Sequence, residues 1–214
     1  MGSGQSSNKE LLYVIGALLG DGCIYKWRNE HQIWLIGDKQ FVNKYSNKLS
    51  VIIGRKVKFY QKRKRNFWYC KISNIKLFNL FQEIRKDHNK ILTVIENDHD
   101  NSLNFIEGFF DAEGCVKVIK EPIRKTPKIC LDITNTNYEL LEIIQNLLKD
   151  SLKIESRYSN QRAFVGKDGF SRKKTYHLRI YKKEHIKDFL KNVNTTKLKP
   201  EKIRYVNNWL NNGK

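Results

Sequence analysis

Apolar residues recur at helical spacing in two runs of the chain that carry the same motif. The first run, VIGALLGDG, spans residues 14–22, and the second, IEGFFDAEG, spans residues 106–114. Each is a predicted helix that closes in an acidic residue and a glycine, and a cysteine and a strand-like basic segment follow each. One such motif alone is consistent with an ordinary buried helix end. Two copies with the same downstream pattern predict an internal repeat, in which Glu113 lies 92 residues after Asp21.

Small residues stand four positions apart in both runs, at Gly16 and Gly20 and again at Gly108 and Ala112. Residues four apart share one face of a helix, so these positions predict two helices that approach backbone to backbone. The glycine after each acid predicts a helix end in the left-handed conformation.

The elements predicted after each motif follow the same order in both halves. In the first half, strands are predicted near 23–28, 32–36, 56–64 and 67–73, with helices at 39–53 and from residue 75. In the second half, strands are predicted near 115–120, 128–134, 153–164 and 174–182, with helices at 138–148 and from residue 184. We therefore predict an α+β chain of two subdomains, residues 9–99 and 100–214, joined by a linker at about 87–102. Residues 1–8 are expected to be a flexible leader or a tag.

The acid at the end of each motif is a candidate metal ligand. If the two motif helices pack in the same direction, Asp21 and Glu113 converge at their C-terminal ends. Two carboxylates held close together repel each other unless a cation lies between them. Oxygen ligands of this kind suit Mg²⁺ better than zinc.

These paired motifs resemble those of the LAGLIDADG homing endonucleases, in the single-chain form that carries two motifs. The resemblance covers about residues 9–210 and implies two αββαββα subdomains whose antiparallel sheets form a DNA-binding saddle. It also implies an intron-encoded endonuclease that acts in intron homing, although an intein origin stays open. The implied reaction is the hydrolysis of one phosphodiester in each strand of a long, asymmetric DNA target, across the minor groove, by metal-activated water.

The resemblance further implies which residues perform the reaction. Asp21 and Glu113 would bind Mg²⁺ together with the backbone carbonyls of Gly20 and Ala112. Mn²⁺ is expected to substitute, and Ca²⁺ to support binding without cleavage. The implied catalytic set adds three residues: Lys199, Lys90 and Asn135. Lys199 can equally be a lysine that precedes a helix, and Gly37 stands in the first half where Asn135 stands in the second. This departure predicts unequal cleavage of the two strands.

Composition agrees with a nucleic-acid partner. The chain has 41 Lys and Arg against 22 Asp and Glu, a formal net charge of +19, and phosphate neutralisation is the usual reason for such an imbalance. Double-stranded DNA is the expected partner, and intron RNA the alternative. The alternatives to an enzyme are therefore an intron RNA maturase or a cleavage-dead DNA-binding protein of the same fold.

Side chains alternate between the faces of a strand, so one face of each basic strand is predicted to contact DNA. The candidate contacts are Lys26, Arg28, Gln32, Lys56, Lys58, Tyr60, Lys62, Lys64, Lys71, Lys117, Lys128, Thr175, His177, Arg179 and Tyr181.

No run approaches the ~18 apolar residues of a membrane span, and no signal peptide is evident. We expect an intracellular monomer that is not secreted, in an archaeal cytoplasm or an organelle. Cys23 and Cys115 follow the two motifs and are predicted to be small buried residues of a reducing compartment.

Overall fold

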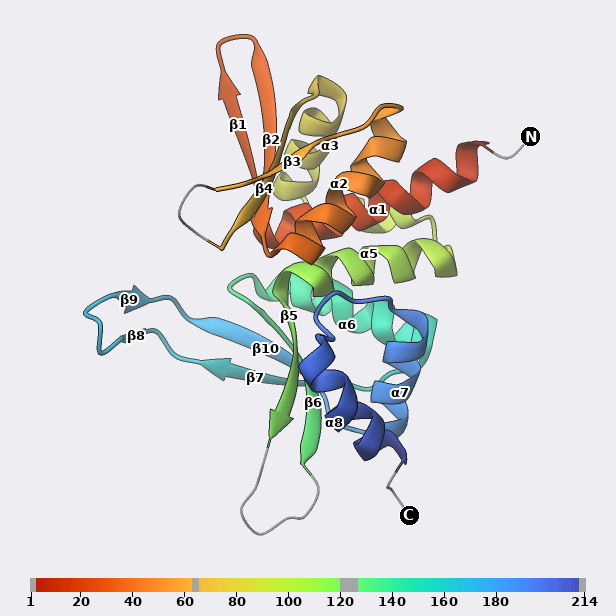
Figure 1. Ribbon diagram of the computed structural model, residues 1–214, viewed down its shortest axis with the longest axis vertical. Coiled ribbons are helices and arrows are strands. Elements are labelled where there is room, and N and C mark those ends of the chain that lie inside the picture. Colours follow the sequence, from red (N-terminus) through yellow and green to blue (C-terminus); the bar gives the residue numbers. More distant parts are fainter. Residues whose placement is uncertain (1–2, 63–65, 120–126, 212–214) are drawn as a thin grey trace. The chain divides into compact units, whose positions relative to one another are not determined.

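The computed structural model describes residues 3–62, 66–119 and 127–211 (Figure 1). The chain divides into two compact units, Met1–Ala112 and Glu113–Lys214. The sequence had placed this division near residue 100. The structure places it later because the helix that carries the second motif packs on a helix of the first unit.

The first unit is an antiparallel sheet covered on one face by helices. Its strands lie in the order β1-β2-β4-β3, and α1, α2 and α3 contact that sheet. Asp38 and Asn74 cap α2 and α3 by accepting hydrogen bonds from the amides of Phe41 and Leu77, which explains where these helices begin. The elements are α1 (Ser3–Asp21), β1 (Gly22–Trp27), β2 (Glu30–Gly37), α2 (Lys39–Ile53), β3 (Phe59–Gln61), β4 (Trp68–Ser73), α3 (Ile75–Lys86), α4 (Lys90–Ile95) and α5 (His99–Glu113).

The second unit repeats this arrangement, with strand order β5-β6-β10-β7. Leu131, Ile133 and Leu178 of the sheet are buried, as are six leucine and isoleucine residues of α6. The short strands β8 and β9 form a separate hairpin that projects beyond β7 and β10 (Figure 1). The elements are β5 (Gly114–Ile119), β6 (Lys128–Asn135), α6 (Tyr138–Leu152), β7 (Arg157–Gln161), β8 (Phe164–Val165), β9 (Ser171–Arg172), β10 (Thr175–Ile180), α7 (Lys183–Asn192) and α8 (Pro200–Asn211).

The α+β class with antiparallel sheets is confirmed, and the differences from the sequence prediction are local. Helix α1 already begins at Ser3, within the expected leader, and α4 and the start of α5 occupy the expected linker. Strand β3 covers residues 59–61 of the strand predicted at 56–64, of which residues 63 and 64 lie outside the described residues. Its early part is not paired with β4, because the Val57 amide donates a hydrogen bond of 2.9 Å to Ser50 Oγ at the end of α2.

Gly22 has a different role from the predicted left-handed helix end. Among the described glycines, positive φ angles occur at Gly54 and Gly169, whereas Gly22 starts strand β1. A Cβ on Gly22 would lie 2.4 Å from the carbonyl oxygen of Leu18. Glycine is needed here because the strand turns back closely over the last turn of α1. Gly114 likewise starts β5.

Cys23 is exposed and Cys115 is half-buried, so the prediction that both are buried is wrong. Both side chains lie on outer sheet faces, and the buried cysteines are Cys70 and Cys130. Across the described helices, none combines the length and apolar character that crossing a membrane requires.

Candidate metal centre and nucleic-acid interface

Helices α1 and α5 pack backbone to backbone, as the small residues predicted. A Cβ on Gly108 would lie 2.0 Å from the carbonyl oxygen of Tyr13, and a Cβ on Gly16 would lie 2.4 Å from that of Phe105. Any larger side chain at either position would force the helices apart. The prediction of a close helix pair is confirmed.

The two helices run in the same direction (Figure 1). Near the N-terminal ends of the helices, Lys9 pairs with Asp100 at 2.5 Å. Further along both helices, Gly16 lies against Phe105 and Phe109. Contacts that advance together along both helices define a parallel pair. The C-terminal turns that carry Gly20–Asp21 and Ala112 therefore lie at the same end of this pair, and Glu113 is the residue after Ala112.

A buried ion network fixes α5 against α1 and α2. Lys44 Nζ on α2 lies 2.8 Å from both Glu107 Oε1 and Asp111 Oδ2, and the Tyr13 hydroxyl donates a hydrogen bond of 2.9 Å to Asp111. Burial, and then the charge of Asp111, raises the pKa of Tyr13, so this hydroxyl keeps its proton. The network surrounds the fully buried Asp111 carboxylate with Lys44 and Tyr13.

Asn135 is in direct contact with the second motif acid. Its Nδ2 donates a hydrogen bond of 2.8 Å to Glu113 Oε1, and its Oδ1 accepts one of 2.8 Å from the Asn137 amide. The amide group is therefore held in one orientation, with its NH₂ directed at the acid. This contact is the geometry expected of a residue that orients a ligating carboxylate.

The first unit cannot hold the same residue at the equivalent position. A Cβ on Gly37 would lie 2.7 Å from Phe41 Cδ1, and Phe41 is a fully buried core residue of α2. The departure seen in the sequence therefore has a packing cause, and the surroundings of the two motif acids differ.

The two candidate lysines lie at helix starts. Lys199 is exposed, and its carbonyl oxygen accepts hydrogen bonds from the amides of Lys202 and Ile203 at the beginning of α8. Lys90 begins α4, and its ammonium group lies 2.9 Å from Glu83. A catalytic role for either residue stays a prediction.

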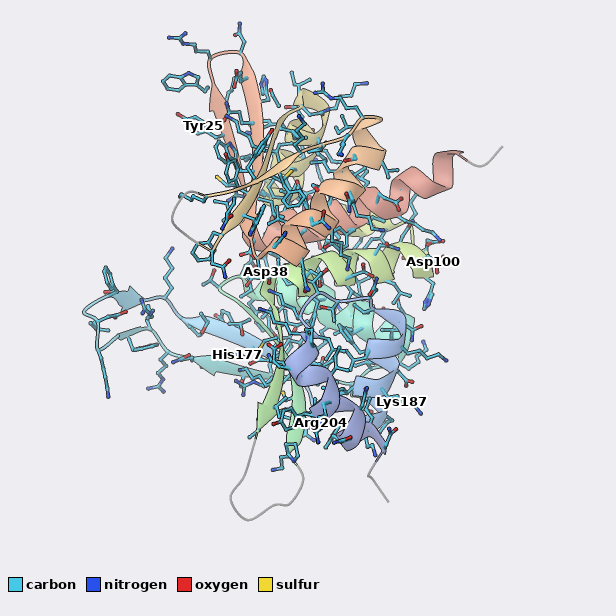
Figure 2. All side chains as sticks on the ribbon, viewed as in Figure 1. Tyr25, Asp38, Asp100, His177, Lys187 and Arg204 are labelled. Carbon is cyan, nitrogen blue, oxygen red and sulfur yellow. The ribbon has the colours of Figure 1, made fainter. Side chains whose placement is uncertain are left out.

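A buried carboxylate that the sequence analysis missed organises the outer face of the second sheet. Asp132 on β6 is fully buried, yet it lies among basic side chains of β5 and β10. Lys117 pairs with Asp132 Oδ2, Arg179 Nε lies 3.3 Å from the same oxygen, and His177 Nδ1 lies 3.2 Å from Oδ1. His177 Nδ1 also lies 2.9 Å from Thr134 Oγ1. Figure 2 shows His177 on this sheet. The acid fixes three predicted DNA contacts relative to one another.

Burial alone would raise the pKa of Asp132, but the hydrogen bond and charge of Lys117, with the charges of Arg179 and His177, lower it below its ordinary value of 3.8. An acid whose pKa is lowered by folding stabilises the fold above its unfolded pKa. This contribution is lost as the pH falls below about 4, through the folded pKa.

We therefore expect the free energy of unfolding of the wild type to fall more steeply than that of Asp132→Asn as the pH is lowered from 5 to below 4. At neutral pH the substitution should cost about 1–3 kcal/mol, because it leaves charged donors without their buried acceptor. Urea unfolding of both proteins at a series of pH values measures this difference. Parallel pH profiles would contradict the role given to Asp132.

Comparisons with known proteins agree with this architecture. Residues 100–194 match the family model of a LAGLIDADG-like domain. A mesophilic variant of the homing endonuclease I-DmoI has a similar structure, with a TM-score of 0.60 and 19% identity over 89% of this chain and 98% of that chain. The I-LtrWI LAGLIDADG homing endonuclease gives a TM-score of 0.53 and 12% identity, covering 93% of this chain and 88% of that one. The chain has the fold of the LAGLIDADG homing endonucleases, and its residues 100–194 match a LAGLIDADG-like domain.

A further solved structure and two curated proteins are also similar to this chain. Full-length DUF199/WhiA from Thermatoga maritima gives a TM-score of 0.61 at 15% identity, covering 97% of this chain and 63% of that chain. Among curated proteins, uncharacterized protein MJ0398 of Methanocaldococcus jannaschii is 26% identical over 194 residues, which cover 86% of this chain and 66% of that protein. A second protein of that organism, uncharacterized protein MJ0314, is 23% identical over 146 residues, covering 66% of this chain and 54% of that protein. The chain thus spans about two thirds or less of these curated relatives.

Most predicted DNA contacts lie on the outer sheet faces or in the loops beside them, but Lys26 pairs with His31 and so lies on the face of β1 opposite to Tyr25. The exposed ones are Lys26, Arg28, Lys56, Lys58, Tyr60, Lys62, Lys71, Lys128 and Tyr181, and the half-buried ones are Lys117, Thr175, His177 and Arg179. Lys64 lies outside the described residues.

Gln32 differs from the other predicted contacts in its burial. Its side chain is on the predicted face, but only 7% of the residue is exposed. The amide donates to Glu30 and accepts a hydrogen bond of 3.1 Å from Trp34 Nε1. Gln32 therefore orients Trp34, and its predicted contact with DNA stays a prediction.

Proposed function

We propose that this protein is a site-specific endonuclease that uses divalent metal ions to hydrolyse one phosphodiester in each strand of a long, asymmetric DNA duplex. The observation that carries the proposal is the parallel α1–α5 pair, because each helix of that pair ends in a motif acid. Solved structures of I-DmoI include complexes with DNA and Mn and with DNA and Ca. The basic outer strands and the net charge of +19 supply the attraction for phosphates.

The donor set fits a hard divalent cation. Asp21 is exposed at the end of α1, Glu113 is oriented by Asn135, and the carbonyls of Gly20 and Ala112 belong to the same last turns. Carboxylate and carbonyl oxygens are the ligands that Mg²⁺ and Mn²⁺ take. The Asp111 carboxylate is engaged by Lys44 and Tyr13, so the network that it belongs to is structural.

Each group of residues would have a separate role in binding and hydrolysing the DNA. Asp21 and Glu113 would hold the ions, which would polarise the scissile phosphate and lower the pKa of the attacking water. Asn135 keeps the Glu113 carboxylate in one orientation. Lys199 and Lys90 are the candidates for assisting proton transfer from water or stabilising the leaving oxygen. Lys117, Arg179 and His177 are held by Asp132 in a fixed pattern that suits base edges in the major groove.

Selection of cleaved sites tests this proposal directly. A randomised duplex library is incubated with the protein and Mg²⁺, and in parallel with Mn²⁺ and with Ca²⁺. Recovery of one long, asymmetric site with Mg²⁺ or Mn²⁺, and binding without cleavage in Ca²⁺, is the expected result. Salt-sensitive binding with no cleavage under any of these conditions would contradict the enzyme and favour a DNA-binding protein.

The unequal surroundings of the two acids predict unequal cleavage of the two strands. Asn135→Ala should slow cleavage about 10- to 100-fold, as loss of a residue that orients a metal ligand usually does. The effect should fall mainly on one strand, because Gly37 supplies no side chain in the first unit. Strand-specific end labels on the selected duplex would then show a nicked intermediate that accumulates. Equal slowing of both strands would contradict the assignment.

A further inference from the structure

The two sheets have equivalent backbones but very different outer faces. Trp34 on β2 is paired with Lys71 on β4, and Asp132 on β6 is paired with Arg179 on β10. The next outward pairs along the strands are Ile36 with Tyr69 in the first unit and Thr134 with His177 in the second. The edge strands add Tyr60 opposite Tyr69 and Ser159 opposite His177. At three of these positions the first sheet carries aromatic rings, Trp34, Tyr69 and Tyr60, where the second carries Asp132, His177 and Ser159.

The rings of the first sheet form a continuous row, here called the aromatic face: Trp34, Tyr69 and Tyr60. The centroids of Trp34 and Tyr69 are 5.9 Å apart with planes at 25°, and those of Tyr69 and Tyr60 are 5.7 Å apart at 34°. Tyr60, at the edge of the row, is 49% exposed. A pocket of about 450 Å³ opens on this face, lined by these rings, Ile36, Gln61 and Lys62.

Basic side chains border the aromatic face. Lys71 Nζ lies 4.6 Å from the centre of the Trp34 ring, and Lys62 is exposed at the pocket. The exposed aromatic Tyr25 on β1 (Figure 2) extends the aromatic character of the same sheet by stacking on Trp27. A ligand that is planar, apolar on its faces and linked to negative charge matches this combination.

Duplex DNA does not present such a ligand, because the faces of paired bases are stacked inside the helix. Only base edges are open in the grooves, and hydrogen-bonding side chains such as those around Asp132 read them. Unpaired nucleotides do expose base faces, and they stack on aromatic side chains beside a positively charged track for the backbone. The structure thus offers polar groups for paired bases in one unit and rings for unpaired bases in the other.

We propose that the aromatic face of the first unit binds unpaired nucleotides of a single-stranded nucleic acid, with Lys71 and Lys62 on the phosphates. This activity is additional to duplex cleavage and does not rest on it.

Binding of unstructured oligonucleotides tests the proposal. Fluorescein-labelled oligo-dT and oligo-U are titrated with the full chain and followed by anisotropy, next to a duplex of the same length. Tyr60→Ser places in the first sheet the residue that the second has at the matching position, and Trp34→Leu removes a ring but keeps an apolar side chain. Each should weaken single-strand binding about 5- to 100-fold, the usual effect of losing one stacked base.

The control is Tyr138→Ser, which removes a 41% exposed tyrosine at the start of α6 in the second unit. It should leave single-strand affinity within about twofold of the wild type. Because stacking is uncharged, the loss in Tyr60→Ser should persist as salt is raised, whereas the loss in Lys71→Gln should shrink. A preference for oligo-dT or for oligo-U would identify DNA or RNA as the source of the strand.

Two results would overturn the proposal. In the first, Tyr60→Ser and Trp34→Leu bind single strands as the wild type does. In the second, they weaken duplex binding alone, which would mean that the rings contact base edges in a groove. Far-UV circular dichroism of each variant separates these results from loss of the fold. Asp21→Asn distinguishes this activity from cleavage, because it should abolish cutting and leave single-strand affinity unchanged.

Discussion

Asp21→Asn and Glu113→Gln are each expected to lower the rate of duplex cleavage in Mg²⁺ by at least about a thousandfold. Each change keeps the size of the side chain but removes the negative charge that holds a divalent cation. A bound cation stabilises the charge that develops on the phosphate by several kcal/mol. A loss of about 4 kcal/mol corresponds to a thousandfold lower rate. Single-turnover cleavage of the selected duplex measures the effect.

The affinity of these variants for DNA should not fall as their cleavage rate does. Neutralising an acid that faces a polyanion removes a repulsion, so DNA affinity in Ca²⁺ or without metal should stay within about tenfold of the wild type or increase. Asp188→Asn and Glu142→Gln are matched controls, because they make the same changes at exposed positions on α7 and α6. Normal cleavage by Asp21→Asn or Glu113→Gln would contradict the assignment of the two acids. An equal loss of cleavage in the two controls would contradict it as well.

Gly108→Ala is expected to destabilise the protein by about 3 kcal/mol or more, although alanine is the better helix former. Helix propensity alone would favour alanine by about 1 kcal/mol. The new Cβ, however, would lie 2.0 Å from the Tyr13 carbonyl oxygen and 3.0 Å from the Ala17 amide nitrogen. Both are main-chain atoms of α1 that cannot rotate away, so the helices must separate and lose contacts along their length. Urea unfolding of the variant beside the wild type measures the cost.

Gly54→Ala is the matched control for this prediction. A Cβ on Gly54 would meet nothing within 4 Å, and the residue has a φ of 72°, so the substitution carries only backbone strain of about 1–2 kcal/mol. If Gly108→Ala cost no more than Gly54→Ala, the close helix contact would not have the importance given to it here. In Gly108→Ala that still folds, the cleavage rate should fall more than the DNA affinity, because the last turns of the helix pair move.

The repeat made much of this fold predictable from the sequence. Helix α2 occupies the predicted residues 39–53, because Asp38 supplies a recognisable cap and Gly54 a recognisable end. The close helix pair was predictable from Gly16 and Gly108, since only glycine lets the backbones of two helices approach so closely. Helix α4 was missed because its six residues carry no side-chain cap.

The detailed interface was less predictable, because strand alternation assigns a side chain to a face but not to its neighbours. Alternation placed Lys117 and Arg179 correctly on an outer face, but the acid between them, Asp132, lies on another strand and is matched to them only by register. Gln32 was placed on the correct face, yet contacts with Glu30 and Trp34 bury it. Gly22 was read as a left-handed residue because a helix end in Asp-Gly does not show the strand that folds back over Leu18.

The central claim is that the acids at the ends of α1 and α5 hold the divalent ion. Cleavage of the polypeptide by hydroxyl radicals from Fe²⁺ and ascorbate tests it most directly, because radicals formed at a bound iron cut the chain next to its ligands. The predicted result is two cuts, near residues 21 and 113, that excess Mg²⁺ suppresses and that Asp21→Asn with Glu113→Gln abolishes. Cuts elsewhere, or cuts that survive in the double variant, would contradict the claim.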